Sequence, residues 1–252
     1  RDLAALAQTG GLTVVNREVS VLDDEGGPGI ELSAAPGDGL AWLDGVAFTT
    51  GTITLDVRGR DVPGQSFVGL AFNGVDDETY EAVYLRPFNF RASNPVQRDH
   101  AVQYVAHPAS TWNVLRESYP EVYENPVIPP PDPDGWVTLR LQVEEAEVRA
   151  YVGEGDQPDL VVDRLAEDGG SRVGLWVGNN SEGAFRNLRI SLDPASVAAG
   201  EQREPSLIQR ALNLLGPGDS TQRTQRAQRS TDTVERIASR GERIRTGDQP
   251  DY

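Results

Sequence analysis

The chain has 252 residues, a formal net charge of −16 at pH 7, and 38% hydrophobic residues, so it is long enough to bury a full core. The acidic balance disfavours binding to the phosphate backbone of nucleic acids, which carries the same sign of charge. Cys is absent, which excludes disulfides and thiolate metal sites, and two His residues, His100 and His107, are too few for a His-rich zinc site.

Charge and composition divide the chain into two parts. Residues 1–195 hold 14 Arg against 31 Asp and Glu, a net charge of −17, whereas residues 196–252 hold 9 Arg against 8 acidic residues, a net charge of +1. All the basic residues are Arg. We therefore predict one domain over 1–195 and a separate tail over 196–252. No apolar run approaches the ~18 residues of a transmembrane helix.

The chain opens with "RDLAALAQ", which has neither an initiator Met nor the apolar stretch of a signal peptide. We expect either a mature N-terminus from which a leader was removed, or a trimmed chain.

Residues 11–192 contain short alternating segments separated by turns. In "GTITLDVRGRD", Ile53, Leu55 and Val57 alternate with polar residues, which predicts a half-buried strand. "SFVGLAFNG" and "YEAVYLRPFNF" predict two strands joined by the turn "VDDET". About eleven such strands, with almost no helix, predict an all-β antiparallel sandwich or jelly roll. The long loop that begins at "STWNVLRE" includes a predicted helical turn at 111–117.

The tail differs in kind from the domain. "EPSLIQRALNLLG" predicts a short apolar helix, "DSTQRTQRAQRSTD" is polar and low in complexity, and "TDTVERIASRGERIR" predicts a second short helix. The acidic domain and the absence of Lys disfavour an anionic membrane surface, so a groove on another protein is the better partner. The residues expected to contact other protein subunits are Leu207, Ile208, Leu212, Leu215, Arg236 and Ile237.

Several segments between residues 66 and 190 have a pattern typical of one superfamily. They are "SFVGLAFNGVDDETYEAVYLRPFNF", "VQYVAHP", "DGWVTLRLQVEEAEVRAYV" and "RVGLWVGNNSEGAFRNLRI". In these segments the chain resembles the concanavalin A-like lectin and glucanase superfamily, and most of all its laminin-G-like and keto-disaccharide hydrolase-like sandwich domains. The resemblance implies a jelly roll of two curved sheets. It does not cover the tail, which its own sequence predicts to be extended and partly helical. It leaves the function open, because this fold hosts lectins, hydrolases and adhesion modules.

A polar and aromatic patch around Arg86 predicts a sugar-binding site, because aromatic rings stack on sugar rings while Arg and amide groups bind hydroxyls. We expect Tyr84, Arg86 and Phe88 to share one face of a strand. The alternative is a structural Arg86 paired with Glu81, Glu117 or Glu124. The predicted ligand-binding residues are Tyr84, Arg86, Asn89, Gln103, Tyr104, His107 and Trp112.

Two turns have oxygen ligands of the kind that a structural Ca²⁺ ion binds. The first includes Asn73, Asp76, Asp77 and Glu78, and the second is "GNNSEG" at 178–183. For both, the alternative is an ordinary polar turn that binds no metal. Apart from this calcium, no cofactor is expected.

Retaining glucanases of this fold have two Glu residues around an Asp at alternate positions on one strand. No strand here has that pattern. Glu144, Glu145 and Glu147 lie where the sequence predicts a hairpin turn. We therefore expect no catalytic residue of this kind.

Two functional hypotheses follow from the sequence. The first is a non-catalytic subunit outside the cytoplasm, periplasmic or extracellular, whose tail attaches it to a larger assembly such as a membrane-anchored respiratory or photosynthetic complex. The second is a domain that binds or processes carbohydrate, in which an enzymatic version would depend on His107 or Glu124.

Overall fold

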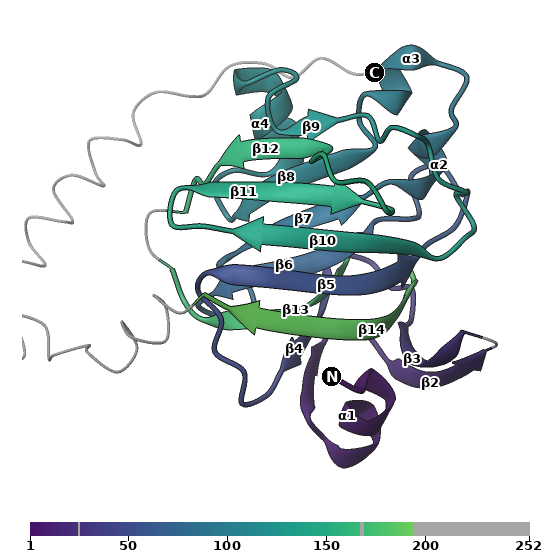
Figure 1. Ribbon diagram of the computed structural model, residues 1–252, viewed down its shortest axis with the longest axis vertical. Coiled ribbons are helices and arrows are strands. Elements are labelled where there is room, and N and C mark those ends of the chain that lie inside the picture. The colour runs from purple at the N-terminus through teal and green to yellow at the C-terminus, as the bar shows by residue number, and fades with distance from the viewer. Residues whose placement is uncertain (25, 167–168, 194–252) are drawn as a thin grey trace, which may run out of the picture. The chain divides into compact units, whose positions relative to one another are not determined.

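Two antiparallel sheets face each other in a computed structural model that describes residues 1–24, 26–166 and 169–193 (Figure 1). Each sheet has seven strands within these residues. The first sheet contains, in spatial order, β1 (Leu12–Val15), β4 (Gly39–Leu43), β13 (Arg172–Val177), β6 (Val68–Gly74), β7 (Tyr80–Leu85), β8 (Val102–His107) and β9 (Glu124–Asn125). The second contains β12 (Leu160–Asp163), β11 (Glu147–Val152), β10 (Val137–Val143), β5 (Gly51–Arg58), β14 (Gly183–Leu192), β3 (Gly27–Leu32) and β2 (Val19–Asp24). The all-β sandwich predicted from the sequence is confirmed.

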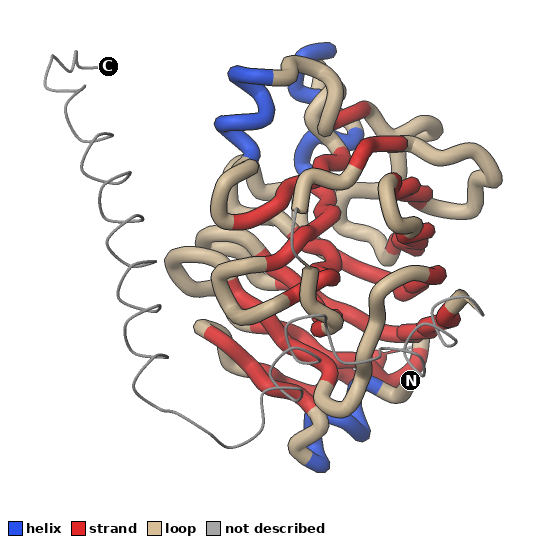
Figure 2. The backbone as a smooth tube through the Cα atoms, turned by 90° about the vertical axis from the view of Figure 1, so that its left-hand side faces the viewer, coloured by secondary structure: helices blue, strands red, loops and turns tan. Residues whose placement is uncertain are grey.

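Four short helices lie at the two ends of the described sandwich (Figures 1 and 2). The sequence predicted α4 (Trp112–Ser118) as a helical turn, but it did not predict the other three. They are α1 (Leu3–Thr9), α2 (Pro87–Phe90) and α3 (Pro95–Arg98). Because α2 begins directly after Arg86, β7 ends at Leu85, and the expectation that Phe88 continues a strand was wrong. Pro87 favours this ending, since it lacks the N–H that a strand ladder needs and is well suited to the first turn of a helix.

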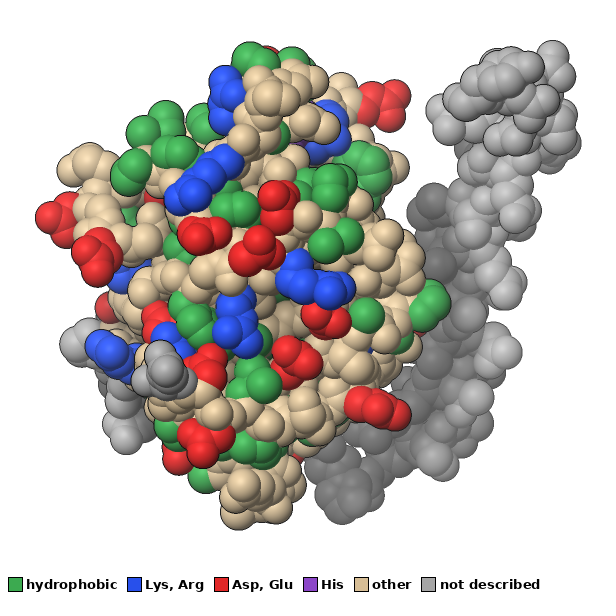
Figure 3. Space-filling model, turned by 90° about the vertical axis from the view of Figure 1, so that its right-hand side faces the viewer, with side chains coloured by type: hydrophobic (Ala, Val, Ile, Leu, Met, Phe, Trp, Pro, Cys, Tyr) green, Lys and Arg blue, Asp and Glu red, His purple; other side chains and the backbone are tan. Residues whose placement is uncertain are grey.

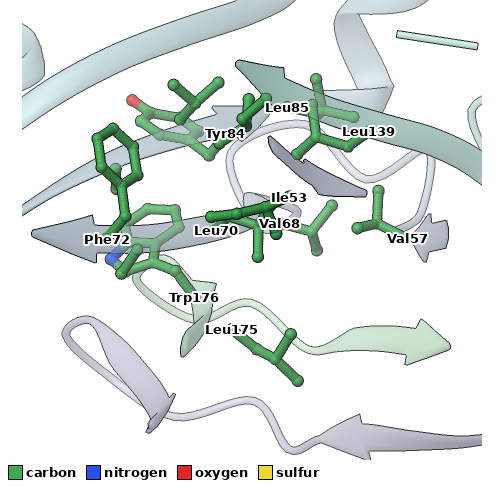
Figure 4. Packing of buried hydrophobic residues seen from close by; sticks show 14 of the residues in the cluster. Ile53, Val57, Val68, Leu70, Phe72, Tyr84, Leu85, Leu139, Leu175 and Trp176 are labelled. Atoms are coloured by element: carbon green, nitrogen blue, oxygen red, sulfur yellow. The ribbon is translucent and has the colours of Figure 1, made fainter. Parts of the chain in front are cut away.

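The hydrophobic core lies between the two sheets. Ile53, Leu55 and Val57 of β5 have no exposed surface, as their alternation predicted. Leu55 pairs with Leu139 of β10, and both face the strands of the first sheet. Figure 4 shows side chains of both sheets meeting in this layer. Each fully buried aliphatic side chain of this size stabilises the fold by about 1.5–3 kcal/mol.

The two sheets differ in how their outer faces are covered. Along β5 and β10 each buried residue is followed by a partly exposed one, so the outer face of the second sheet meets solvent. Every residue of β6 and β7 is buried, inward and outward positions alike. The outer face of these two strands is therefore covered by other segments of the chain, and the candidate site lies there.

A buried ion pair occupies the inner side of β7. Glu81 is 0% exposed, and its carboxylate accepts hydrogen bonds from Arg164, Tyr104 and Asn73. Arg164 follows β12 of the second sheet, so the pair joins the two layers. The buried carboxylate is stable in this position because it has both a counter-charge and several hydrogen bonds.

The surface of the sandwich mixes charges of both signs. Over the face drawn in Figure 3, acidic and basic side chains alternate with small apolar areas. In the described part of the chain, no helix has both the length and the hydropathy to cross a bilayer.

Candidate functional site

A row of residues across four strands forms the floor of the site. Trp176 of β13 pairs with Gly69 of β6, Gly69 pairs with Tyr84 of β7, and Tyr84 pairs with Gln103 of β8. Because Gly69 has no side chain, the rings of Trp176 and Tyr84 meet beside it, with their centroids 4.7 Å apart. A pair of aromatic rings, 3% and 4% exposed, thus lies on the outer side of the sheet and lines the cavity above it.

The floor continues along the strands in two further rows. Two residues further along the strands from the Tyr84 row, the side chains are small. They are Ala71, Ala82 and Val105, and they leave space above the sheet. Beyond this row Tyr80 pairs with His107, and their rings stack with centroids 4.9 Å apart. Since a strand rises about 3.3 Å per residue, the Tyr84 and Tyr80 rows lie roughly 13 Å apart.

Loops and short helices around this floor enclose a cavity of about 570 Å³. Phe67 and Phe88 form an aromatic wall, with their rings edge to face at 5.6 Å. Trp112 on α4 lines the opening, and 49% of its surface is exposed. The volume and the mixture of aromatic and polar groups are typical of small-molecule sites.

Arg86 lies at one end of the cavity and is 5% exposed. Its guanidinium donates to the backbone carbonyl of His100 at 2.9 Å, to the Tyr84 hydroxyl at 2.9 Å, and to Oε1 of Gln103. It also stacks against the Tyr84 ring, 5.0 Å from the ring centroid. Burial lowers the pKa of Arg86, although nearby groups oppose the shift.

Glu124 of β9 is the carboxylate closest to Arg86, at 3.7 Å, but it is bound more tightly by Arg116 of α4. Arg116 donates from Nε to Oε1 at 2.9 Å and from Nη2 to Oε2 at 2.6 Å. This bidentate pair raises the pKa of Arg116, with the hydrogen bond as the largest cause. Nδ1 of His100 also lies 2.9 Å from Glu124, and burial lowers the pKa of His100.

The other end of the cavity contains a chain of hydrogen bonds that ends at Asp38. The indole N–H of Trp176 donates to the Tyr80 hydroxyl at 3.2 Å, and that hydroxyl donates to Asp38 at 3.2 Å. Nε2 of His107 lies 3.8 Å from the same carboxylate oxygen. Burial lowers the pKa of His107 and outweighs the opposing effect of Asp38, and burial raises the pKa of Tyr80.

The structure brings most of the predicted ligand-binding residues to this cavity. Gln103, at the end of the floor row, is fully buried and orients Arg86 rather than lining the space. Tyr104 points to the opposite face of β8, toward Glu81. Adjacent strand residues face opposite ways, so Gln103 and Tyr104 could not both face one site. The predicted residues that line the cavity are Tyr84, Arg86, Asn89, His107 and Trp112.

Sequence reasoning missed several residues of the cavity. Asp38 and Phe67 come from loops whose approach to the sheet has no local sequence signal. Trp176 was part of a predicted strand, but its pairing with Gly69 depends on strand order. Arg86 lines the cavity and also lies near Glu124, one of its three suggested partners, so its role in binding a ligand stays a prediction.

The acidic turn after β6 has protein partners for its polar groups. Asp76 accepts the backbone N–H groups of Glu78 and Thr79, and Asp77 accepts from Trp42 and pairs with Arg172. The Asn73 amide donates to Glu81 at 2.6 Å, inside the core. Among the described residues, no three His, Cys, Asp or Glu side chains gather as a metal site would require. These contacts explain the turn without an ion, and calcium stays an untested prediction.

The second turn, at 178–183, joins β13 to β14. Asn179 accepts the backbone N–H of Gly37 at 2.8 Å, and Ser181 accepts that of Phe67 at 3.0 Å. The turn therefore fixes two loops at the margin of the cavity, and Gly178 and Asn179 themselves line it.

Comparisons with known proteins give the fold. No family model and no curated protein matches the chain. Among solved structures, a glycoside hydrolase family 16 endo-glucanase from Bacteroides ovatus is similar with a TM-score of 0.50 and 11% identity, over 71% of this chain and 94% of that one. The chain has the concanavalin A-like jelly-roll fold. A carbohydrate-binding module, CBM66, from Bacillus subtilis has a TM-score of 0.49 and 16% identity, over 71% of this chain and 93% of that one.

The predicted partner-binding residues, from Leu207 to Ile237, lie outside the described residues, as does the whole tail from 196 onward. The hypothesis of a subunit held in an assembly by its tail therefore stays a prediction.

Proposed function

We propose that the cavity on the outer face of the first sheet binds carbohydrate, and that the domain is a binding module. The observation that supports this most is the arrangement of rings and polar groups in one space. Tyr84 and Trp176 form an aromatic floor, Trp112 is half exposed at the opening, and Arg86 lies at one end. Rings of this kind stack on the apolar faces of sugars, and the polar groups bind their hydroxyls.

The length of the floor suits an extended ligand. The Arg86 end and the Asp38 end supply different chemistry, donors at the first and a carboxylate acceptor at the second. A sugar chain has both donors and acceptors in each unit, so it would find partners along the whole floor.

Binding rather than hydrolysis is proposed because glycoside hydrolysis needs two carboxyl groups on either side of the scissile bond. Among the described residues that line the cavity, Asp38 is the one carboxylate. Glu124 is held in a bidentate pair with Arg116, so it is poorly placed to exchange protons.

A glycan array followed by calorimetry tests the proposal. We expect binding to at least one glycan class, with Trp112→Ala weakening it about tenfold or more, because a stacking ring is lost. Tyr119→Ala is the matched control, since Tyr119 is 52% exposed near α4 but does not line the cavity. The proposal fails if no glycan binds, or if both variants bind as the unmodified protein does.

A further inference from the structure

The charges at the Arg86 end of the cavity do not balance. Two guanidinium groups, those of Arg86 and Arg116, meet one carboxylate, Glu124. Arg116 donates hydrogen bonds to both oxygens of that carboxylate, at 2.6 and 2.9 Å. Nη1 of Arg86 lies 3.7 Å from Oε2 of the same carboxylate. Asp38, at the other end, contacts Tyr80 and His107 instead.

Arg86 is therefore a buried cation whose close hydrogen-bond partners are neutral. They are a backbone carbonyl, a hydroxyl and an amide oxygen. A charge in such a position is unfavourable unless a counter-charge completes it. Among the residues that the structure describes, the carboxylate paired with the guanidinium groups at this end is Glu124.

We infer that the cavity selects acidic sugars, and that Arg86 binds the anionic group, a carboxylate or a sulfate, of one sugar unit. This rests on the proposed function and names its ligand class. The hydrogen bonds to Tyr84 and Gln103 use both hydrogens of Nη2 and hold the guanidinium in one orientation. The anionic group would therefore bind through the remaining N–H groups of Arg86. The net charge of −16 repels polyanions, so the attraction at Arg86 is local and acts on a single anionic group.

The first test changes the ligand and leaves the protein intact. The array is read as two matched series: neutral oligosaccharides, and acidic ones carrying uronic acid units or sulfate esters. For the strongest uronic acid binder, calorimetry is repeated with its carboxyl groups converted to methyl esters, and for the strongest sulfated binder with its desulfated form. We expect neutralisation of the ligand to weaken binding at least tenfold.

The second test uses two substitutions with opposite expected effects. Arg86→Gln removes the unmatched charge and should weaken acidic glycans at least tenfold. Glu124→Gln leaves both guanidinium groups without a carboxylate and should strengthen acidic glycans several-fold, measured below the unfolding temperature of each variant. The control is Arg140→Gln, which makes the same charge change as Arg86→Gln but lies on β10 of the second sheet. It should not change the affinity for acidic glycans.

The outcomes separate this inference from the proposed function. If neutral glycans bind and acidic ones do not, or if neutralised ligands bind as well as acidic ones, the inference is overturned while carbohydrate binding stands. If no glycan of either series binds, the proposed function itself fails. If both substitutions weaken binding equally, Arg86 has a structural role and the inference is wrong. A preference for carboxylated or for sulfated ligands identifies the anionic group.

Discussion

At the scale of single residues, Glu81 and Arg86 show two ways of placing a charge out of water. Glu81 is fully enclosed and has Arg164 as its counter-charge, so the interior of the sandwich is neutral at that point. Arg86 is nearly as buried, but it lines a cavity. The carboxylate near it, that of Glu124, is bound more closely by Arg116. The first arrangement serves the fold, and the second leaves a charge available to a ligand.

Replacing Glu81 with Gln should therefore destabilise the protein strongly. The change keeps the shape of the side chain but leaves the guanidinium of Arg164, whose side chain is 11% exposed, without its counter-charge. We expect this to cost about 3–5 kcal/mol in the free energy of unfolding. Urea denaturation of both proteins measures this. Glu144→Gln removes a partner of Arg149 at the surface and should cost less than about 1 kcal/mol. Equal costs for the two substitutions would show that the inner pair does not hold the sheets together.

His107 should make the stability depend on pH. Burial holds its pKa below the value of 6.5 that it has when unfolded, so the unfolded chain binds a proton more readily. The contribution of neutral His107 is present above pH 6.5 and is lost as the pH falls through the lowered pKa. Unfolding free energies from pH 8 to 5 should fall less steeply for His107→Gln than for the unmodified protein. Parallel curves for the two proteins would contradict this.

The residue patterns of the sequence predicted part of the site. Side-chain alternation correctly indicated the inward face of β5, and Arg86 was correctly placed in a polar and aromatic patch. Alternation would also have separated Glu81 from the outward-facing Tyr84 on the same strand. Asp38 and Trp176 were missed, because the contact of Asp38 with Tyr80 and that of Trp176 with Tyr84 join segments far apart in the sequence.

At the scale of elements, the row across β13, β6 and β7 depends on Gly69. A Cβ atom at this position would lie 2.2 Å from the carbonyl oxygen of Val83 and 2.6 Å from Cα of Tyr84, both backbone atoms that cannot yield cheaply. The close approach brings the rings of Trp176 and Tyr84 together. Strand spacing and the cavity floor are thus set by one glycine.

Gly69→Ala should cost about 1–3 kcal/mol of unfolding free energy, because the added methyl group forces β6 and β7 apart. It should also weaken glycan binding, since the floor rings would shift. Thermal denaturation and calorimetry measure the two effects. Gly155→Ala, in an open loop where the nearest atom to the new Cβ is 3.9 Å away, should change stability by less than about 0.5 kcal/mol. If Gly69→Ala is as mild as this control, the row does not set the spacing.

The elements that the sequence did not predict have a common cause. Helix α1 has seven residues, and its stability comes from Leu3 packing on the core and from capping by Asp2 and Gly10, rather than from its own propensity. Helices α2 and α3 each have four residues and begin with Pro. Whether segments this short form helices depends on tertiary contacts, and the local sequence pattern carries no information about those contacts.

At the scale of the molecule, both sheets and their shared core are formed by residues before 194. We expect a chain ending at residue 193 to fold cooperatively, with an unfolding free energy within about 1 kcal/mol of that of the full chain, because a domain with its own core folds alone. Circular dichroism and urea denaturation measure this. An aggregated or non-cooperative fragment would contradict the predicted division of the chain near residue 195.

The most direct test of the central claim uses the four tryptophans as separate probes. Trp112 and Trp176 line the cavity, whereas the indole N–H of Trp42 donates to Asp77 and that of Trp136 donates to Asp24, outside the cavity. In a nitrogen–proton correlation spectrum titrated with the strongest glycan from the array, the indole signals of Trp112 and Trp176 should shift with a common saturation curve while the other two stay in place. Shifts confined to Trp42 or Trp136, or no shift at Trp112 and Trp176 at saturation, would contradict carbohydrate binding in this cavity.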